Sequence, residues 1–157
     1  MKSYYFHDEL WLPTPRAELF SFFAEAQNLE SITPPWLNFK ILTPGRLRMR
    51  AGVLIDYRLR LHGFPLRWQT EITAWEPPHR FVDEQRRGPY RLWRHEHAFF
   101  DADGGTLCHD DVEYRVVGGA LVNRFFVRRD VERIFAYRRE ALLARFGGTP
   151  EAVAART

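Results

Sequence analysis

Two histidines, His95 and His97, are the residues whose type and spacing best suit chemistry in this sequence. They lie in the stretch from Phe81 to Phe100, FVDEQRRGPYRLWRHEHAFF, where two alternating segments flank an Arg-Arg-Gly-Pro sequence. Glycine and proline between alternating flanks predict a β-hairpin. Successive side chains of a strand point to opposite faces, so both histidines share a face with Trp93 and Phe99. We place this face inward, because the opposite face carries the full charges.

Two inward imidazoles need hydrogen-bond partners or a cavity that holds water, because an unpartnered buried polar group is costly. The spacing His95-x-His97 could also serve a metal ion, with Asp83 or Asp110 as a third ligand. We favour a pair of hydrogen-bonded cavity histidines over a metal centre, because this spacing alone is a weak signal. We therefore expect no metal and no other cofactor.

A carboxylate beside an imidazole raises the imidazole pKa and holds one tautomer, which is the first part of a general acid–base device. Asp110 is expected beside His95 or His97, because a short turn joins their strands. These three residues are the catalytic candidates. A buried network that only satisfies polar groups around a wet cavity is the simpler interpretation, and the two are compatible.

The strand before the histidines offers two further polar candidates, Asp83 and Gln85. They point inward if Gly88 lies in a three-residue turn, which would set Trp93 opposite Asp83, whereas a two-residue turn would reverse the faces. Arg138 lies on the apolar stripe of the C-terminal helix. It could neutralise an inward aspartate, meet an acidic ligand, or extend its charged end into water.

Composition limits the class of protein. The chain has 157 residues, 45% of them apolar and 15% aromatic, which predicts one folded domain at 1–147 and a loose tail at 148–157. The net charge of +3 comes from dispersed arginines, which argues against nucleic-acid binding. The single Cys108 excludes an intramolecular disulfide and a cysteine metal cluster. Without an apolar leader or membrane-length segment, we expect a cytoplasmic monomer or weak homodimer with no stable membrane insertion.

The first part of the chain predicts a strand followed by two short helices. Residues 4–12 form the strand. Apolar residues lie on both of its faces, so the sequence does not decide which face points inward. Thr14 is a candidate cap and Pro15 a candidate first residue for the helix that follows. Asn28 is a candidate cap for the second helix at 29–32.

From residue 39 onward the hydrophobic pattern has a period of two, which predicts half-buried strands. It places Trp68 and Ala74 inward on one strand, and Asp110 inward among apolar residues on the last strand. Consecutive hairpins give an antiparallel meander, whose apolar face must be covered. The expected elements are strands at 39–42, 53–62, 66–75, 81–86, 92–100 and 107–116, and one covering helix at 119–146.

This order of elements resembles the helix-grip fold of the SRPBCC superfamily, which includes START lipid-transfer domains, pollen-allergen-type carriers and polyketide cyclases. Three stretches resemble a bacterial subfamily of unassigned function with polyketide cyclase/dehydrase-like members: NLESITPPWLNF at 28–39, DYRLRLHGFPLRWQTEI at 56–72 and DEQRRGPYRLWRHEHAF at 83–99. The resemblance implies an α+β fold. A curved seven-stranded antiparallel sheet would wrap around the C-terminal helix, with an elongated cavity between them.

Three functions follow as hypotheses. The first is binding of a small hydrophobic or aromatic, lipid- or polyketide-like molecule in the cavity. The second is a cyclase or dehydratase that uses a cavity histidine as general acid or base. The third is a regulatory module with a vestigial, filled pocket. The residues expected to contact a ligand are Tyr57, Trp68, Asp83, Gln85, Trp93, His95, His97, Phe99, Asp110, Tyr114, Phe135 and Arg138.

Overall fold

One antiparallel sheet of seven strands organises the molecule, in the order β1-β7-β6-β5-β4-β3-β2. The computed structural model describes residues 1–147, and the tail expected at 148–157 lies outside the described residues. The α+β helix-grip fold predicted from the sequence is confirmed. The strands are β1 (Tyr4–Leu12), β2 (Lys40–Ile41), β3 (Leu54–Leu61), β4 (Phe64–Glu76), β5 (Arg80–Arg87), β6 (Leu92–Ala102) and β7 (Gly105–Arg115).

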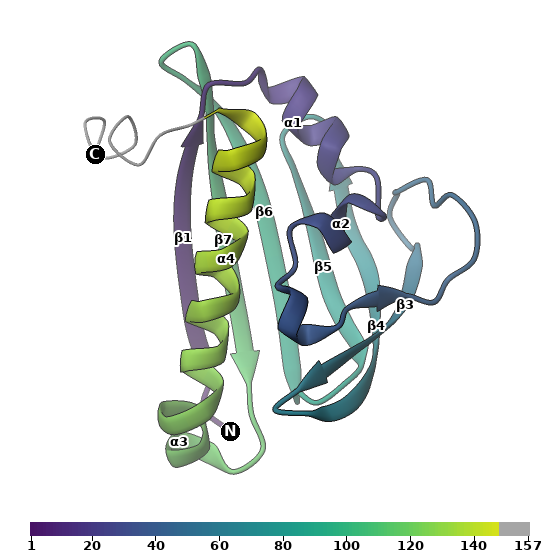
Figure 1. Ribbon diagram of the computed structural model, residues 1–157, viewed down its shortest axis with the longest axis vertical. Coiled ribbons are helices and arrows are strands. Elements are labelled where there is room, and N and C mark those ends of the chain that lie inside the picture. The colour runs from purple at the N-terminus through teal and green to yellow at the C-terminus, as the bar shows by residue number, and fades with distance from the viewer. Residues whose placement is uncertain (148–157) are drawn as a thin grey trace.

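The helices lie on one side of this curved sheet (Figure 1). The C-terminal helical segment consists of α3, a π-helical turn η2 and the long α4, which runs along the strands near β1 and β7, while α1 and α2 lie beside it. No helix of residues 1–147 is long and apolar enough to cross a membrane. The helical elements are α1 (Arg16–Phe23), α2 (Asn28–Ser31), η1 (Pro35–Leu37), α3 (Gly119–Val122), η2 (Asn123–Val127) and α4 (Arg128–Phe146).

The ends of α1 and α2 differ from the sequence prediction. Pro15 occupies the position before α1, with no side-chain cap, and the carbonyl of Thr14 instead accepts a hydrogen bond of 2.7 Å from the hydroxyl of Thr106. The Asn28 side chain donates to the carbonyl of Phe22 at 2.8 Å. Asn28 therefore satisfies a carbonyl at the end of α1 rather than capping the start of α2.

The sequence did not decide which face of β1 points inward. In the structure it is the face of Leu10 and Leu12, which are buried, while Tyr5 is exposed.

On β4 the prediction for Ala74 is wrong. The ladder to β5 shifts register between Ile72 and Ala74, so Trp75 takes the inward position and packs against the ring of Phe20 at 4.9 Å. A β-bulge of this kind re-aims the side chains that follow it.

The β5–β6 hairpin keeps the predicted faces in a different register. Asp83 pairs with His95, two residues beyond the predicted Trp93, because the connection is longer than a three-residue turn. A shift of two residues preserves the face, since strand side chains alternate with period two. Asp83 therefore still points inward.

Candidate functional site

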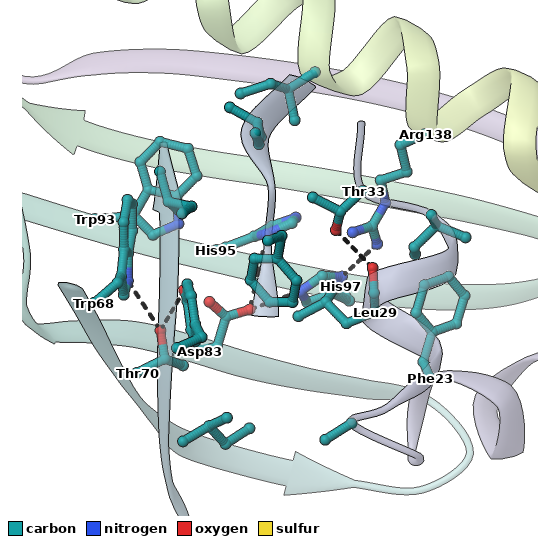
Figure 2. A pocket seen from close by; sticks show the side chains of 18 of the residues that line it. Phe23, Leu29, Thr33, Trp68, Thr70, Asp83, Trp93, His95, His97 and Arg138 are labelled. Atoms are coloured by element: carbon teal, nitrogen blue, oxygen red, sulfur yellow. Dashed lines mark hydrogen bonds and ion pairs between the residues drawn. The ribbon is translucent and has the colours of Figure 1, made fainter. Parts of the chain in front are cut away.

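A cavity of about 190 Å³ lies between the inward face of the sheet and the helices α1, α2, η1 and α4. It has an aromatic end, an aliphatic wall from α2 and η1, and one polar wall (Figure 2). On the solvent side, Trp36 of η1 contacts Tyr137 and Arg133 of α4, with ring centroids 5.6 Å apart for the first pair. The η1 segment and α4 therefore meet beside the cavity.

The aromatic end is built on β3, β4 and β6. The rings of Tyr57 and Trp68 stack at 5.8 Å, and Trp93 meets Trp68 edge to face at 5.6 Å. The Trp68 indole N–H donates to the Thr70 hydroxyl at 3.2 Å, and the Tyr57 hydroxyl lies at the same distance from that oxygen. These contacts satisfy the polar atoms of both rings, so the rings offer mainly apolar surface to a ligand.

The polar wall contains two histidines that share two carboxylates. His97 Nε2 lies 2.8 Å from Asp83 Oδ2, and His95 Nε2 lies 2.7 Å from Asp110 Oδ1. The two imidazole rings are 3.7 Å apart between centroids. Register explains this proximity, because Asp83 pairs with His95 across β5–β6 and Asp110 pairs with His97 across β6–β7. We call Asp83, His95, His97 and Asp110 the inner cluster.

Arg138 from α4 supplies the fixed positive charge of this wall. Its guanidinium lies 3.3 Å from Asp110 Oδ1 and 3.2 Å from His97 Nδ1. The guanidinium also lies over the rings of Phe23 and Phe135, at 5.2 and 5.8 Å from their centroids. Of the three possibilities that the sequence left for this arginine, neutralising an aspartate is observed, and its side chain is buried rather than extended into water.

The inner cluster shifts the pKa values of its members in different directions. Burial raises the pKa of both carboxyl groups, but Arg138 and the imidazoles outweigh it, and the net pKa of Asp110 lies well below its usual range. Burial and the neighbouring imidazole lower the pKa of His95. Burial also opposes charge on His97, but its hydrogen bonds to both carboxylates raise its pKa overall.

These directions favour one balanced set of charges. Two carboxylates face Arg138, so the buried network is electrically neutral when His97 is protonated and His95 is not. A neutral network avoids the large cost of an unpaired buried charge. A ligand that carries a charge of either sign would disturb this balance.

Most of the residues predicted to contact a ligand lie at the cavity surface. Asp110 was expected to contact at least one of His95, His97 and Arg138, and it lies within hydrogen-bond distance of His95 and Arg138. The predicted residues that line the cavity are Tyr57, Trp68, Asp83, Trp93, His95, His97, Phe135 and Arg138.

Four predicted contacts do not line the cavity. Gln85 instead holds the hairpin connection, where its amide donates to the Tyr90 carbonyl at 2.7 Å and accepts from the Tyr90 backbone N–H at 3.2 Å. Phe99 packs in the core beside α1, and Tyr114 packs in the core below α4. Asp110 lies behind the imidazoles, so it acts on a ligand only through them.

The sequence prediction missed the wall formed by α2 and η1. Leu29, Ile32, Thr33 and Leu37 line the cavity from this segment. The signal was present in the stretch 28–39, where apolar residues alternate with turn-forming residues in a segment too short to bury them against itself. Tyr90 and Ile134 are further lining residues that the prediction omitted.

Comparison with known proteins agrees with this architecture. Residues 12–137 match the family described as polyketide cyclase / dehydrase and lipid transport. The Zhui aromatase/cyclase from Streptomyces sp. R1128 is similar in structure, with a TM-score of 0.72 and 14% identity over 93% of this chain and 94% of that chain. Protein Ms6760 from Mycobacterium smegmatis has a TM-score of 0.67 and 18% identity, over 89% of this chain and 88% of that chain.

A part of a larger protein is also similar. The nucleoside-diphosphate sugar epimerase from Corynebacterium glutamicum has a TM-score of 0.59 and 22% identity over 88% of this chain, but only 28% of that chain. No curated protein sequence matches the chain. At these identities the structural similarities establish the fold, not a ligand or a reaction.

Proposed function

Because the chain belongs to the polyketide cyclase/dehydrase and lipid transport family, we propose that it binds a small, electrically neutral aromatic molecule in the cavity. The observation that carries this proposal is the cavity of about 190 Å³, lined by aromatic and aliphatic side chains except at one polar wall. An engineered protein cavity of about 150 Å³ binds benzene. The volume here therefore suits one substituted ring or two fused rings better than a multi-ring polyketide or a two-chain lipid.

The polar wall supports the choice of a neutral ligand. The inner cluster and Arg138 balance their charges when His97 is protonated and His95 is neutral. An anionic ligand would then have to be offset by protonation of His95, and a cationic ligand by loss of the His97 proton. A neutral ligand with one hydroxyl or carbonyl group can exchange a hydrogen bond with this wall without that cost. The ligand class that fits is a small phenol or aryl ketone.

Calorimetric titration with 2-naphthol tests the proposal. We expect binding that is at least tenfold tighter than that of the anion 2-naphthoate. Ile134→Trp, which fills the cavity from α4, should abolish binding, whereas Leu121→Trp should not, because Leu121 is exposed on α3 away from the lining residues. Equal binding by both variants would contradict the proposal.

A second function is favoured by one specific observation, namely the opposite pKa shifts of two histidines that both line the cavity. Adjacent titratable groups whose pKa values are pushed apart can serve as base and acid. In such a reaction the neutral His95 would accept a proton from the carbon next to a ligand carbonyl, and the charged His97 would donate one to the carbonyl oxygen, which gives an enol.

Deuterium exchange next to the carbonyl of 2-tetralone tests this second function. Exchange followed by NMR should be faster with the protein than in buffer, and His95→Gln should remove the acceleration while the affinity for 2-tetralone is kept. If His95→Gln keeps both the acceleration and the affinity for 2-tetralone, His95 is not the base, and binding remains the function of the site. The third hypothesis, a regulatory module, would be favoured by a filled pocket, and the cavity of about 190 Å³ does not support it.

A further inference from the structure

The outer face of the sheet carries a second group of histidines and carboxylates. His7 and Glu9 alternate on β1, and His109 and Asp111 alternate on β7. Glu9 pairs directly with His109 across the ladder, and His7 pairs with Asp111. The four side chains therefore form a two-by-two patch on the face opposite the cavity, which we call the outer cluster.

Three donor atoms of this cluster converge. His7 Nε2 lies 3.1 Å from Glu9 Oε1, His109 Nε2 lies 3.5 Å from the same oxygen, and all three atoms lie within 4.8 Å of one another. Ligand atoms around a tetrahedral zinc ion, at bond lengths of about 2.0–2.1 Å, are separated by roughly 3.3–3.4 Å. The separations from Glu9 to both imidazoles are close to this value.

The orientation of the imidazoles is suited to a metal. His7 Nδ1 lies 2.7 Å from Asp111 Oδ1, so the carboxylate can accept that N–H and leave Nε2 to face the other donors. Metal-binding histidines commonly have their second nitrogen held by a carboxylate in this way. The His109 ring packs against Phe100 at 4.9 Å, and its Nε2 is buried without a hydrogen-bond partner among residues 1–147.

The charge of the outer cluster is also suited to a cation. Within residues 1–147, the ion pairs of the Glu9 and Asp111 side chains are formed with histidines and not with arginine or lysine. Arg139 approaches β1, but it bonds to the Asp8 carboxylate and to the backbone carbonyl of Glu9. In the described part of the chain, these two carboxylates thus share one patch without an ion pair to arginine or lysine.

We propose that His7, Glu9 and His109 bind a divalent transition metal ion of the zinc class, with Asp111 positioning His7. Two imidazoles and one carboxylate are a zinc ligand set, and the fourth position would face solvent, because the His7 and Glu9 side chains are 50% and 43% exposed. The ion would join the edge strand β1 to β7. This site is separate from the cavity and differs from the sequence expectation of no metal.

Calorimetric titration of the untagged full chain with Zn²⁺ tests the proposal. We expect one equivalent of zinc to bind, with affinity at least tenfold weaker in His109→Ala and about tenfold weaker in Asp111→Asn. His79→Ala, outside both clusters, should bind zinc as the original chain does. In thermal unfolding, zinc should raise the Tm of the original chain and of His79→Ala, but not that of His109→Ala.

His97→Gln decides between the two faces of the sheet. Zinc binding that survives in His97→Gln and weakens in His109→Ala supports the outer cluster. The reverse pattern would place the ion in the cavity and overturn the proposal. It would also be overturned if no zinc binds, or if equimolar Mg²⁺ displaces the zinc, because an acidic surface patch without imidazole ligands has no preference for zinc over magnesium.

Discussion

The inner and outer clusters contain the same residue types, two histidines and two carboxylates, on opposite faces of one sheet. They differ in surroundings. The inner cluster is buried and pairs with a fixed cation, Arg138, whereas the ion pairs of the outer carboxylates involve only histidines within residues 1–147.

This difference decides what each cluster can hold. In the cavity, Arg138 already pairs with Asp110, and with His97 protonated the two aspartates are fully neutralised. A divalent ion would then add uncompensated positive charge in a medium that solvates it poorly. On the outer face, water solvates any excess charge, and within residues 1–147 the carboxylates pair with histidines rather than with arginine or lysine. The inner cluster therefore suits a proton and the outer cluster suits a metal ion.

The largest expected effect separates two neighbouring residues of β7. Asp110→Asn should lower the free energy of unfolding by about 3–5 kcal/mol, because it leaves the buried Arg138 without its carboxylate partner. Asp111→Asn is the matched control on the other face, and it should change stability by no more than about 0.5 kcal/mol without added metal, because its partner is exposed. Urea denaturation of both variants measures the contrast, and equal losses would remove the distinction between the clusters.

A smaller effect concerns the pH dependence of stability. The pKa of His97 is raised in the folded protein, so its favourable contribution is fully present below the ordinary imidazole value near 6.5 and is lost as the pH rises through the raised value. The stability difference between the original chain and His97→Gln should therefore shrink as the pH increases from 5.5 to 9. Unfolding free energies across this range check the sign, and a difference that grows with pH would show that His97 is not the charged member.

The smallest expected effect is on proton exchange of the imidazoles. The His97 and His95 side chains are 6% and 7% exposed and bonded to carboxylates, whereas His7 is 50% exposed. Side-chain N–H resonances of the inner histidines should persist in water at neutral pH, and that of His7 should be lost to solvent exchange without added metal. NMR spectra recorded in water, with assignments from single His→Gln variants, measure this. Rapid exchange at all three would mean that the cavity network is open to solvent.

The fold could be predicted because its pattern is local and periodic. Alternation placed Asp110 inward among Cys108 and Val112, and the helical stripe placed Arg138 on the covering face, so their contact was one of the alternatives that the sequence left open. The error in the β5–β6 register did not alter the site, since a shift of two residues keeps Asp83 on the same face.

What failed depended on tertiary geometry. Gln85 was assigned to the cavity by alternation, but a strand pattern cannot show that a side chain bends back onto the backbone of Tyr90. The outer cluster escaped notice because His7 and His109 are far apart in the sequence, and only the pairing of β1 with β7 brings them together. No spacing rule within a single segment contains that information.

The contact between Trp36 of η1 and α4 affects the residence time of a bound ligand. The α2–η1 segment forms a whole wall of the cavity, yet it consists of short helical turns outside the sheet. Such segments open at a lower free energy than the strands, so the wall can separate from Tyr137 while the sheet and α4 stay folded. We therefore expect residence time to be set by this wall rather than by global stability, so that a chain made more stable in its core would release its occupant no more slowly.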